Sequence, residues 1–290
     1  MKRAYLELHV AVLLFGFTAI LGKVISLEEL PLVWYRLLLT SPALLLILLL
    51  TKRPVMLPWG EIRKLAGIGI IVSLHWLTFY GSIKASNASI TLSCLASSTL
   101  FTSVLEPLII KRPFRWFEAA IGLFIIFGIY LIFTFQQLYL TGIILGLLSA
   151  FLAALFSVMN KKLIEGRDTY VVTFYELTSG FLFLSLLIPV YAYWQPEMRY
   201  APEPMDWLWL MILAWLCTVL AYTLSLNSLR HISAYTSNLT INLEPVYGIV
   251  LAWLLLNENE QLHAGFYAGT GIILSSVILY PVLKRLTQNR

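Results

Sequence analysis

The chain has 290 residues, of which 59% are hydrophobic and only 12% are charged, and its net charge is +5. Soluble domains carry about 25% charged residues, so a soluble core could not bury this much apolar sequence. The apolar residues form long runs that suit membrane-spanning helices, not the short alternating segments of a β-barrel. We therefore expect an all-α integral membrane protein and exclude a soluble or nucleic-acid-binding class.

The apolar runs predict ten transmembrane helices joined by short connections. In chain order they cover roughly residues 5–26, 31–51, 65–84, 88–110, 116–135, 141–162, 170–194, 207–229, 232–256 and 264–283. The longest connection, residues 195–206, is polar and rich in proline. None of these connections has room for a soluble domain.

Basic residues predict the orientation of the chain. If the N-terminus is cytoplasmic, most of the 20 Lys and Arg residues fall on the cytoplasmic side of the predicted spans. The opposite connections instead carry acidic residues such as Glu28, Glu29, Glu197 and Glu203. Cytoplasmic loops of membrane proteins are enriched in Lys and Arg. We therefore expect a multi-pass protein of the cell inner membrane with both termini in the cytoplasm.

The two halves of the chain resemble each other. Residues 82–88 (SIKASNA) match residues 228–234 (SLRHISA), and residues 33–37 (VWYRL) match residues 173–177 (TFYEL). The halves, residues 1–138 and 139–290, would each hold five spans. Since an odd number of spans forces the second half to enter from the opposite side, the pattern predicts two inverted five-helix repeats, which is typical of secondary transporters.

Glu244 and Pro245 interrupt the ninth predicted span. An ionised Glu inside a bilayer costs roughly 2.5–3.5 kcal/mol on insertion scales, so the group must face water, a partner or a substrate. Pro245 has no N–H and leaves a carbonyl one turn back free, which predicts a break in the helix. Glu244 would bind a substrate ammonium, carry a coupling proton, or accept hydrogen bonds that hold the broken helix.

At this point the sequence resembles the drug/metabolite transporter superfamily, and within it the EamA family. The resemblance rests on residues 243–246 (LEPV), 82–85 (SIKA), 228–230 (SLR) and 35–37 (YRL), together with the ten spans and the repeat. It implies export of amino acids and other small metabolites across the bacterial inner membrane; relatives move nucleotide sugars or triose phosphates in eukaryotic organelles. The chain departs from the family pattern at Phe15 and at Lys111–Arg112.

Two polar stripes are expected to line a central cavity. If each span is a continuous helix, one stripe on span 9 and one on span 4 each fall on one face. They consist of Ser233, Ser237, Thr240 and Glu244, and of Asn87, Thr91, Cys94 and Ser98. The alternative is that these small polar residues only hold helices together, and we assign that role to Asn238 and Asn242.

Three further groups stand out in the apolar runs. Arg36 and Glu176 occupy equivalent positions in the two halves with opposite charge. They are candidates for gating, for an ion pair across the repeat interface, or for binding the two ends of a zwitterion. In span 3, His75, Trp76 and Tyr80 could line the cavity wall, or His75 could simply bond to a neighbouring helix. Glu106, before Pro107, is interpreted as a helix-end feature.

The sequence thus predicts a carrier that exports a small metabolite, with amino acids the first choice, by alternating access. The alternatives are a facilitative, channel-like carrier, a multidrug, nucleoside or sugar transporter, or, more remotely, a membrane enzyme or assembly subunit. Partners would be the substrate, the lipid bilayer, a coupling proton and a second copy of the chain. No catalytic motif is present, and we expect no cofactor, no metal site and no disulfide between Cys94 and Cys217.

Overall fold

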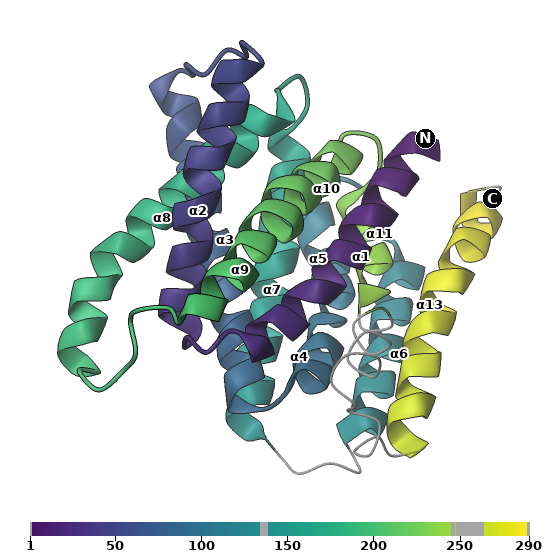
Figure 1. Ribbon diagram of the computed structural model, residues 1–290. Helices are drawn as coiled ribbons and strands as arrows, with labels where there is room; N and C mark the ends of the chain where they lie inside the picture. The colour runs from purple at the N-terminus through teal and green to yellow at the C-terminus, as the bar shows by residue number, and fades with distance from the viewer. Residues whose placement is uncertain (1, 134–138, 245–246, 248–263, 289–290) are drawn as a thin grey trace.

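The computed structural model describes residues 2–133, 139–244, 247 and 264–288, and nearly all of these residues are helical, with no strand among them. Figure 1 shows one bundle, in which the two ends of the described chain lie on the same side. In chain order the elements are α1 (Lys2–Val24), α2 (Glu29–Leu50), α3 (Trp59–Ala85), α4 (Ala88–Leu95), α5 (Ser98–Ile110), α6 (Trp116–Phe133), α7 (Leu140–Leu163), α8 (Thr169–Trp194), α9 (Pro204–Ala214), the π-helix η1 (Trp215–Leu220), α10 (Ala221–Leu229), α11 (Ala234–Ile241) and α13 (Ala264–Gln288).

Eight helical segments in the described part are long and apolar enough to cross a membrane, and Trp116–Leu131 in α6 is a shorter apolar helix. The surface of the bundle is consistent with a position in a membrane, because large apolar side chains such as Leu50, Phe127 and Leu186 are exposed. Water disfavours such continuous apolar surface, whereas lipid accepts it. The expected span over residues 232–256 is described only up to Glu244 and at Tyr247, so the number of ten stays a prediction.

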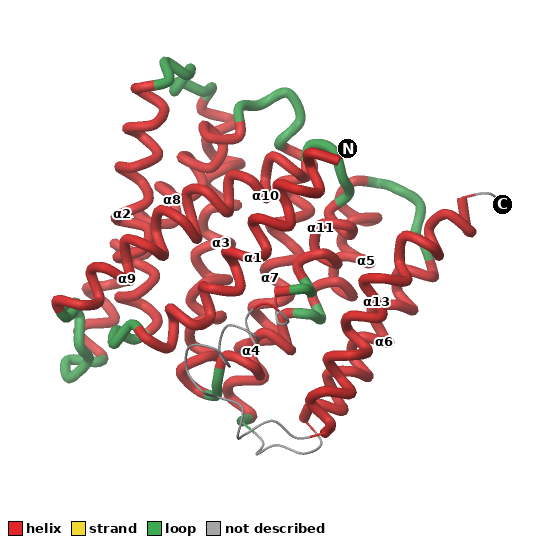
Figure 2. Tube along the Cα trace, turned by 45° about the vertical axis from the view of Figure 1, so that its right-hand side comes forward, coloured by secondary structure: helices red, strands yellow, loops and turns green. Residues whose placement is uncertain are grey.

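Helices from the two halves of the chain pack against one another and not only within their own half. Each of these contacts joins a helix of the first half to one of the second: α1 contacts α10, α2 contacts α8, α3 contacts both α7 and α8, and α5 contacts α11. Helices α6 and α13 lie side by side at one edge of the bundle in both views (Figure 2). A space enclosed at the centre of the bundle is therefore walled by both halves.

Two helices that the sequence predicts as continuous are interrupted. The span over residues 88–110 breaks into α4 and α5 at a turn formed by Ala96 and Ser97, whose hydroxyl donates to the carbonyl of Cys94 at 2.7 Å. Such hydroxyl bonds to the backbone compete with helical bonding. The span over residues 207–229 contains the π-helix η1, which adds a residue to the turn. Each interruption changes the face on which later residues lie.

Acidic side chains fix the start of two helices. Asp168 precedes α8 and accepts a hydrogen bond from the backbone N–H of Tyr170 at 2.9 Å, which satisfies a donor that the first turn leaves free. Asp206, in the first turn of α9, accepts from the backbone N–H of Ser26 at 2.9 Å and from its hydroxyl at 2.6 Å. The connection between α1 and α2 is thereby attached to α9.

Glycine permits the close crossing of α3 and α8. A Cβ at Gly69 would overlap the backbone carbonyl of Glu176, whereas a Cβ at Gly67 on the same helix would meet nothing within 4 Å. We expect Gly69→Ala to lower the free energy of unfolding by about 1–3 kcal/mol, as overpacked cores do. Gly67→Ala should leave it unchanged or raise it by up to about 1 kcal/mol, because alanine favours helix. Thermal unfolding of both variants in one detergent measures this, and equal effects would contradict it.

Candidate functional site

A pocket lies between helices of the two halves and holds about 770 Å³ of space, counting the part that opens to solvent. Its walls are mostly apolar and aromatic, and among the described lining residues the basic side chain Arg36 on α2 and the acidic side chain Glu244 beyond α11 stand out. Aromatic rings come from Phe15, Trp76, Phe79, Phe156 and Tyr222, and small polar groups from Thr18, Ser98, Ser157, Ser225 and Asn238. An apolar pocket with few polar groups is the usual form of a small-molecule site.

Arg36 is buried, with only 2% of it exposed, and hydrogen bonds fix the position of its guanidinium group. Its Nε donates to the hydroxyl of Thr218 at 2.7 Å, one terminal nitrogen donates to the hydroxyl of Tyr80 at 3.1 Å, and the other to the carbonyl of Cys217 at 3.4 Å. Its guanidinium carbon lies 3.6 Å from the centre of the Trp76 ring. Thr218 and Cys217 belong to η1, so the π-helix supplies two of the partners.

No carboxylate lies within ion-pair distance of Arg36 in the part of the chain that the structure describes. Its hydrogen-bond partners among the described residues are neutral, and they leave other N–H groups of the guanidinium unused. A buried cation with spare donors facing a pocket can bind an anionic group of a ligand, since planar guanidinium matches carboxylate geometry.

Glu244 supplies an acidic group in the same pocket and is 3% exposed. It is neither hydrogen-bonded nor ion-paired to Arg36, whose described partners are Thr218, Tyr80 and Cys217. A carboxylate in this position can accept bonds from an ammonium group. Pro245, the predicted helix break, lies outside the described residues, although α11 already ends at Ile241.

Two of the three candidates on α3 line the pocket. Trp76 and His75 line it, and the His75 ring Nδ1 lies 2.9 Å from the hydroxyl and 3.0 Å from the carbonyl of Ser149 on α7. Tyr80 does not line the pocket but reaches it through its bond to Arg36. His75 therefore combines the two predicted alternatives, because its side chain bonds to a neighbouring helix and also lines the pocket.

Of the residues in the two predicted stripes, Ser98 and Glu244 line the pocket. Asn87 caps α4 by accepting from the backbone N–H of Ile90 at 2.8 Å, and the Thr91 hydroxyl lies 2.7 Å from that of Ser82. Thr240 donates to the carbonyl of Thr236 at 2.8 Å, while the buried hydroxyl of Ser237 has no partner in the part of the chain that the structure describes. The stripe predicted on span 4 assumed a continuous helix. Because the chain breaks between α4 and α5, Ser98 does not share a helical face with Asn87, Thr91 and Cys94.

Asn238 and Asn242 form interhelical bonds, as predicted. The Asn238 amide donates to the hydroxyl of Thr102 at 2.7 Å and the Asn242 amide to that of Thr99 at 2.8 Å. Both bonds join α11 and its end to α5, so they connect the two halves of the chain.

Glu176 and Arg36 do not meet, although they occupy equivalent positions in the two halves. The Glu176 carboxyl lies on α8 and is completely buried, where its Oε2 accepts from the hydroxyl of Tyr222 at 2.8 Å and from the amide of Asn160 at 3.3 Å. Tyr222 is also a wall of the pocket. Glu176 is thus one side chain away from the pocket and not in its wall.

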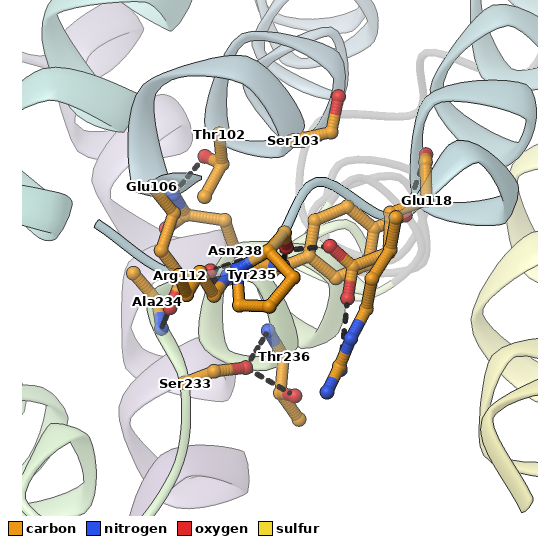
Figure 3. A network of polar contacts seen from close by, with 12 residues as sticks. Thr102, Ser103, Glu106, Arg112, Glu118, Ser233, Ala234, Tyr235, Thr236 and Asn238 are labelled. Atoms are coloured by element: carbon orange, nitrogen blue, oxygen red, sulfur yellow. Dashed lines mark hydrogen bonds and ion pairs between the residues drawn. The ribbon is translucent and has the colours of Figure 1, made fainter. Parts of the chain in front are cut away.

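Sequence analysis missed the role of Glu106, which does lie near the end of α5 but reaches across to α11. Its two carboxylate oxygens accept from the backbone N–H groups of Ala234 and Tyr235 at 3.1 and 3.0 Å (Figure 3). Arg112 lies 3.0 Å from Glu106 and 2.5 Å from Glu118. The sequence signal was three charged residues spaced six apart in a largely apolar stretch.

The Glu106 network joins helices of both halves, α5 and α6 to α11 and α13. The hydroxyl of Tyr235 donates to the backbone carbonyl of Glu118 at 3.0 Å, and the hydroxyl of Tyr280 on α13 donates to its carboxylate at 3.2 Å. Within the residues described, no three His, Cys, Asp or Glu side chains group as metal ligands would. Cys94 and Cys217 are both buried and free.

Comparison with known proteins supports a transport role for this arrangement. The family model of the EamA-like transporter family matches residues 2–134 and again residues 140–280. An uncharacterized transporter of Archaeoglobus fulgidus is 26% identical over 295 residues, which cover 96% of this chain and 96% of that protein. An uncharacterized transporter of a Synechocystis strain is 25% identical over 134 residues, 45% of this chain and 38% of that protein.

A solved crystal structure shares the fold, with a TM-score of 0.75 at 16% identity, over 99% of this chain and 99% of that chain. The likeness concerns architecture alone. The family match, by contrast, covers nearly the whole chain in two consecutive stretches. Together with the outward apolar surface of the bundle, it identifies the chain as a multi-pass membrane transporter that belongs to the EamA-like transporter family.

Proposed function

We propose that this transporter is a secondary carrier that exports amino acids, or metabolites of similar shape and charge, across the bacterial inner membrane by alternating access. The observation that carries the substrate class is the presence of Arg36 and Glu244 in one aromatic-walled pocket. An amino acid offers a carboxylate to the first, an ammonium to the second, and a side chain to the apolar walls. Both charged ends of the ligand would then replace water with protein partners.

Alternating access by two inverted five-helix halves, residues 1–138 and 139–290, is supported by the twofold family match and by walls drawn from both halves. The excess of Lys and Arg on one side supports cytoplasmic termini. Export is the direction that the family resemblance implies. Ser98, His75, Trp76 and Tyr80 would contact the substrate or its Arg36 anchor. Asn87, Thr91, Ser237 and Thr240 would join the path when the halves rearrange.

The test is transport of labelled amino acids by the purified chain in proteoliposomes, with unlabelled competitors that lack one charged end. An amine without the carboxylate and an acid without the ammonium should each compete at least about 10-fold more weakly, because a hydrogen bond to a charged group contributes about 1.5–3 kcal/mol. The matched control is an amino acid with the same side chain and both charged ends.

The same assay separates the alternatives. Saturable flux that follows an imposed pH gradient would mean proton coupling, and saturable flux that ignores the gradient would mean facilitated diffusion. Flux that never saturates would indicate a channel-like path. If no amino acid is transported and nucleosides, sugars or hydrophobic cations are, the substrate assignment is wrong while the carrier fold stands. A second copy of the chain as partner stays a prediction.

A further inference from the structure

The buried carboxyl of Glu176 is only half satisfied. Both of its hydrogen bonds, from Tyr222 and Asn160, reach the same oxygen, Oε2. The other oxygen, Oε1, is buried and has no partner among the described residues, and the same is true of Oδ1 on Asn160, whose amide nitrogen binds Glu176. Two buried acceptors on hydrogen-bonded side chains therefore lack a donor among the described residues. Buried polar atoms are rarely left unpaired, so this pair calls for an explanation.

No cation compensates Glu176 among the described residues. On the elements packed against α8, the interior titratable groups bind elsewhere: Arg36 of α2 to Thr218, Tyr80 of α3 to Arg36, His75 of α3 to Ser149, and Lys161 of α7 to the carbonyl of Leu229. Tyr222 of α10 donates but carries no charge. Tyr175 of α8 itself donates to the carbonyl of Val55. The remaining charged residues of α2 and α3 are Glu29, Glu61 and Lys84 in end turns, and the exposed Arg63 and Lys64 in the second turn of α3.

Two other buried carboxyls, Glu106 and Glu118, have a different environment. Glu106 and Glu118 are 2% and 1% exposed, and both bind Arg112. Glu176 is as buried but has neither a cation nor backbone N–H donors. An unpaired carboxylate in such a site is very costly, whereas the neutral acid is not. A proton on Oε1 would also turn one orphaned acceptor into a donor for the other, Oδ1 of Asn160.

We propose that Glu176 is a proton-binding site of this protein, held as a carboxylic acid that donates to Asn160 and accepts from Tyr222. Release breaks the Oε1–H bond, passes the proton to water and leaves a carboxylate, and no other reactant is needed. Tyr222 connects this site to the pocket, because its hydroxyl binds Glu176 and its ring is part of the wall. The backbone of Glu176 also touches Gly69 at the crossing of α3 and α8, so a charge appearing there would act on an interface between the two halves.

Infrared spectroscopy tests the proton directly, because the carbonyl stretch of a carboxylic acid is separate from that of a carboxylate. The wild-type protein near neutral pH should show a carboxylic-acid band that shifts in heavy water, is lost in Glu176→Gln and fades as the pH is raised. The matched control is Glu106→Gln, with Glu118→Gln as a second, since both remove an equally buried but ion-paired carboxyl; neither should remove the band. Glu244→Gln assigns any second band.

A band that persists unchanged in a folded Glu176→Gln variant, or no such band at all, would overturn the proposal. Tyr222→Phe gives an independent check, since losing the bond to Oε2 should shift the Glu176 band without removing it; no shift would contradict the arrangement. These readouts need no substrate, so they stand or fall apart from the proposed export of amino acids. Coupling of this proton to transport is a separate step that rests on the proposed function. Transport should then lose its pH dependence in Glu176→Gln, and an unchanged pH profile would refute the coupling.

Discussion

Replacing Arg36 with lysine is expected to raise the substrate concentration for half-maximal transport of an amino acid by roughly 10- to 100-fold. Lysine keeps the positive charge but not the planar fork that binds Thr218, Tyr80 and Cys217 together and lies on Trp76. Arg and Lys are not interchangeable where stacking and several directed bonds fix the group. Losing well-oriented bonds to a charged group costs about 1.5–3 kcal/mol, which is that range of affinity.

The matched variant is Thr218→Val, which removes one bond to Arg36 and leaves the guanidinium in place. Since one neutral partner contributes about 0.5–1.5 kcal/mol, its effect on half-saturation should be clearly smaller. Glu244→Gln should act on the other end of the substrate, so that the variant no longer distinguishes an amino acid from the acid without its ammonium. Transport kinetics in proteoliposomes measure all three, and a lysine variant with wild-type half-saturation would contradict the assignment of Arg36.

Much of the architecture could be predicted because the bilayer imposes it. Lipid forces every spanning segment to satisfy its own backbone, so long apolar runs become helices with boundaries close to the prediction. Helix α8 occupies Thr169–Trp194 where residues 170–194 were expected, and α2 occupies Glu29–Leu50 where 31–51 were expected. The turn at Ala96 and Ser97 and the π-helix at Trp215–Leu220 were not predicted. Neither segment contains Gly or Pro, the residues that most often signal a break in a helix.

Partners of the buried polar groups were harder to predict than their importance. Glu244 was found from the cost of a charge in a membrane, and Arg36 and Glu176 were found as charged residues at equivalent positions of the repeat. The bond from Arg36 to Thr218 spans 182 positions of the chain, and its acceptor lies in a π-helix that the sequence did not predict. Likewise, the equivalent positions of Arg36 and Glu176 suggested a pair, but their surroundings differ. Local pattern locates a charged residue, and tertiary packing decides what it binds.

Replacing Glu106 with alanine is expected to lower the free energy of unfolding by about 3–5 kcal/mol, the usual cost of removing one partner of a buried ion pair. The change leaves the N–H groups of Ala234 and Tyr235 without their acceptor and takes one of two carboxylates from Arg112. Glu61→Ala is the control, because its pair with Arg167 at 2.7 Å is partly exposed and surface pairs contribute little. Thermal unfolding of both variants in one detergent gives the comparison.

The same substitution should change which side of the carrier is open. Glu106 bonds α5 of the first half to the first turn of α11 in the second, and Tyr235 and Tyr280 extend the contact to Glu118. If the halves separate at this end during transport, these bonds must break, so removing them favours the separated state. A cysteine at buried Ser103, in a background without Cys94 and Cys217, should react faster with a cytoplasmic thiol reagent in Glu106→Ala than in Glu61→Ala. Equal labelling despite a large loss of stability would mean that Glu106 only holds the fold together, because a gate must alter access as well as stability.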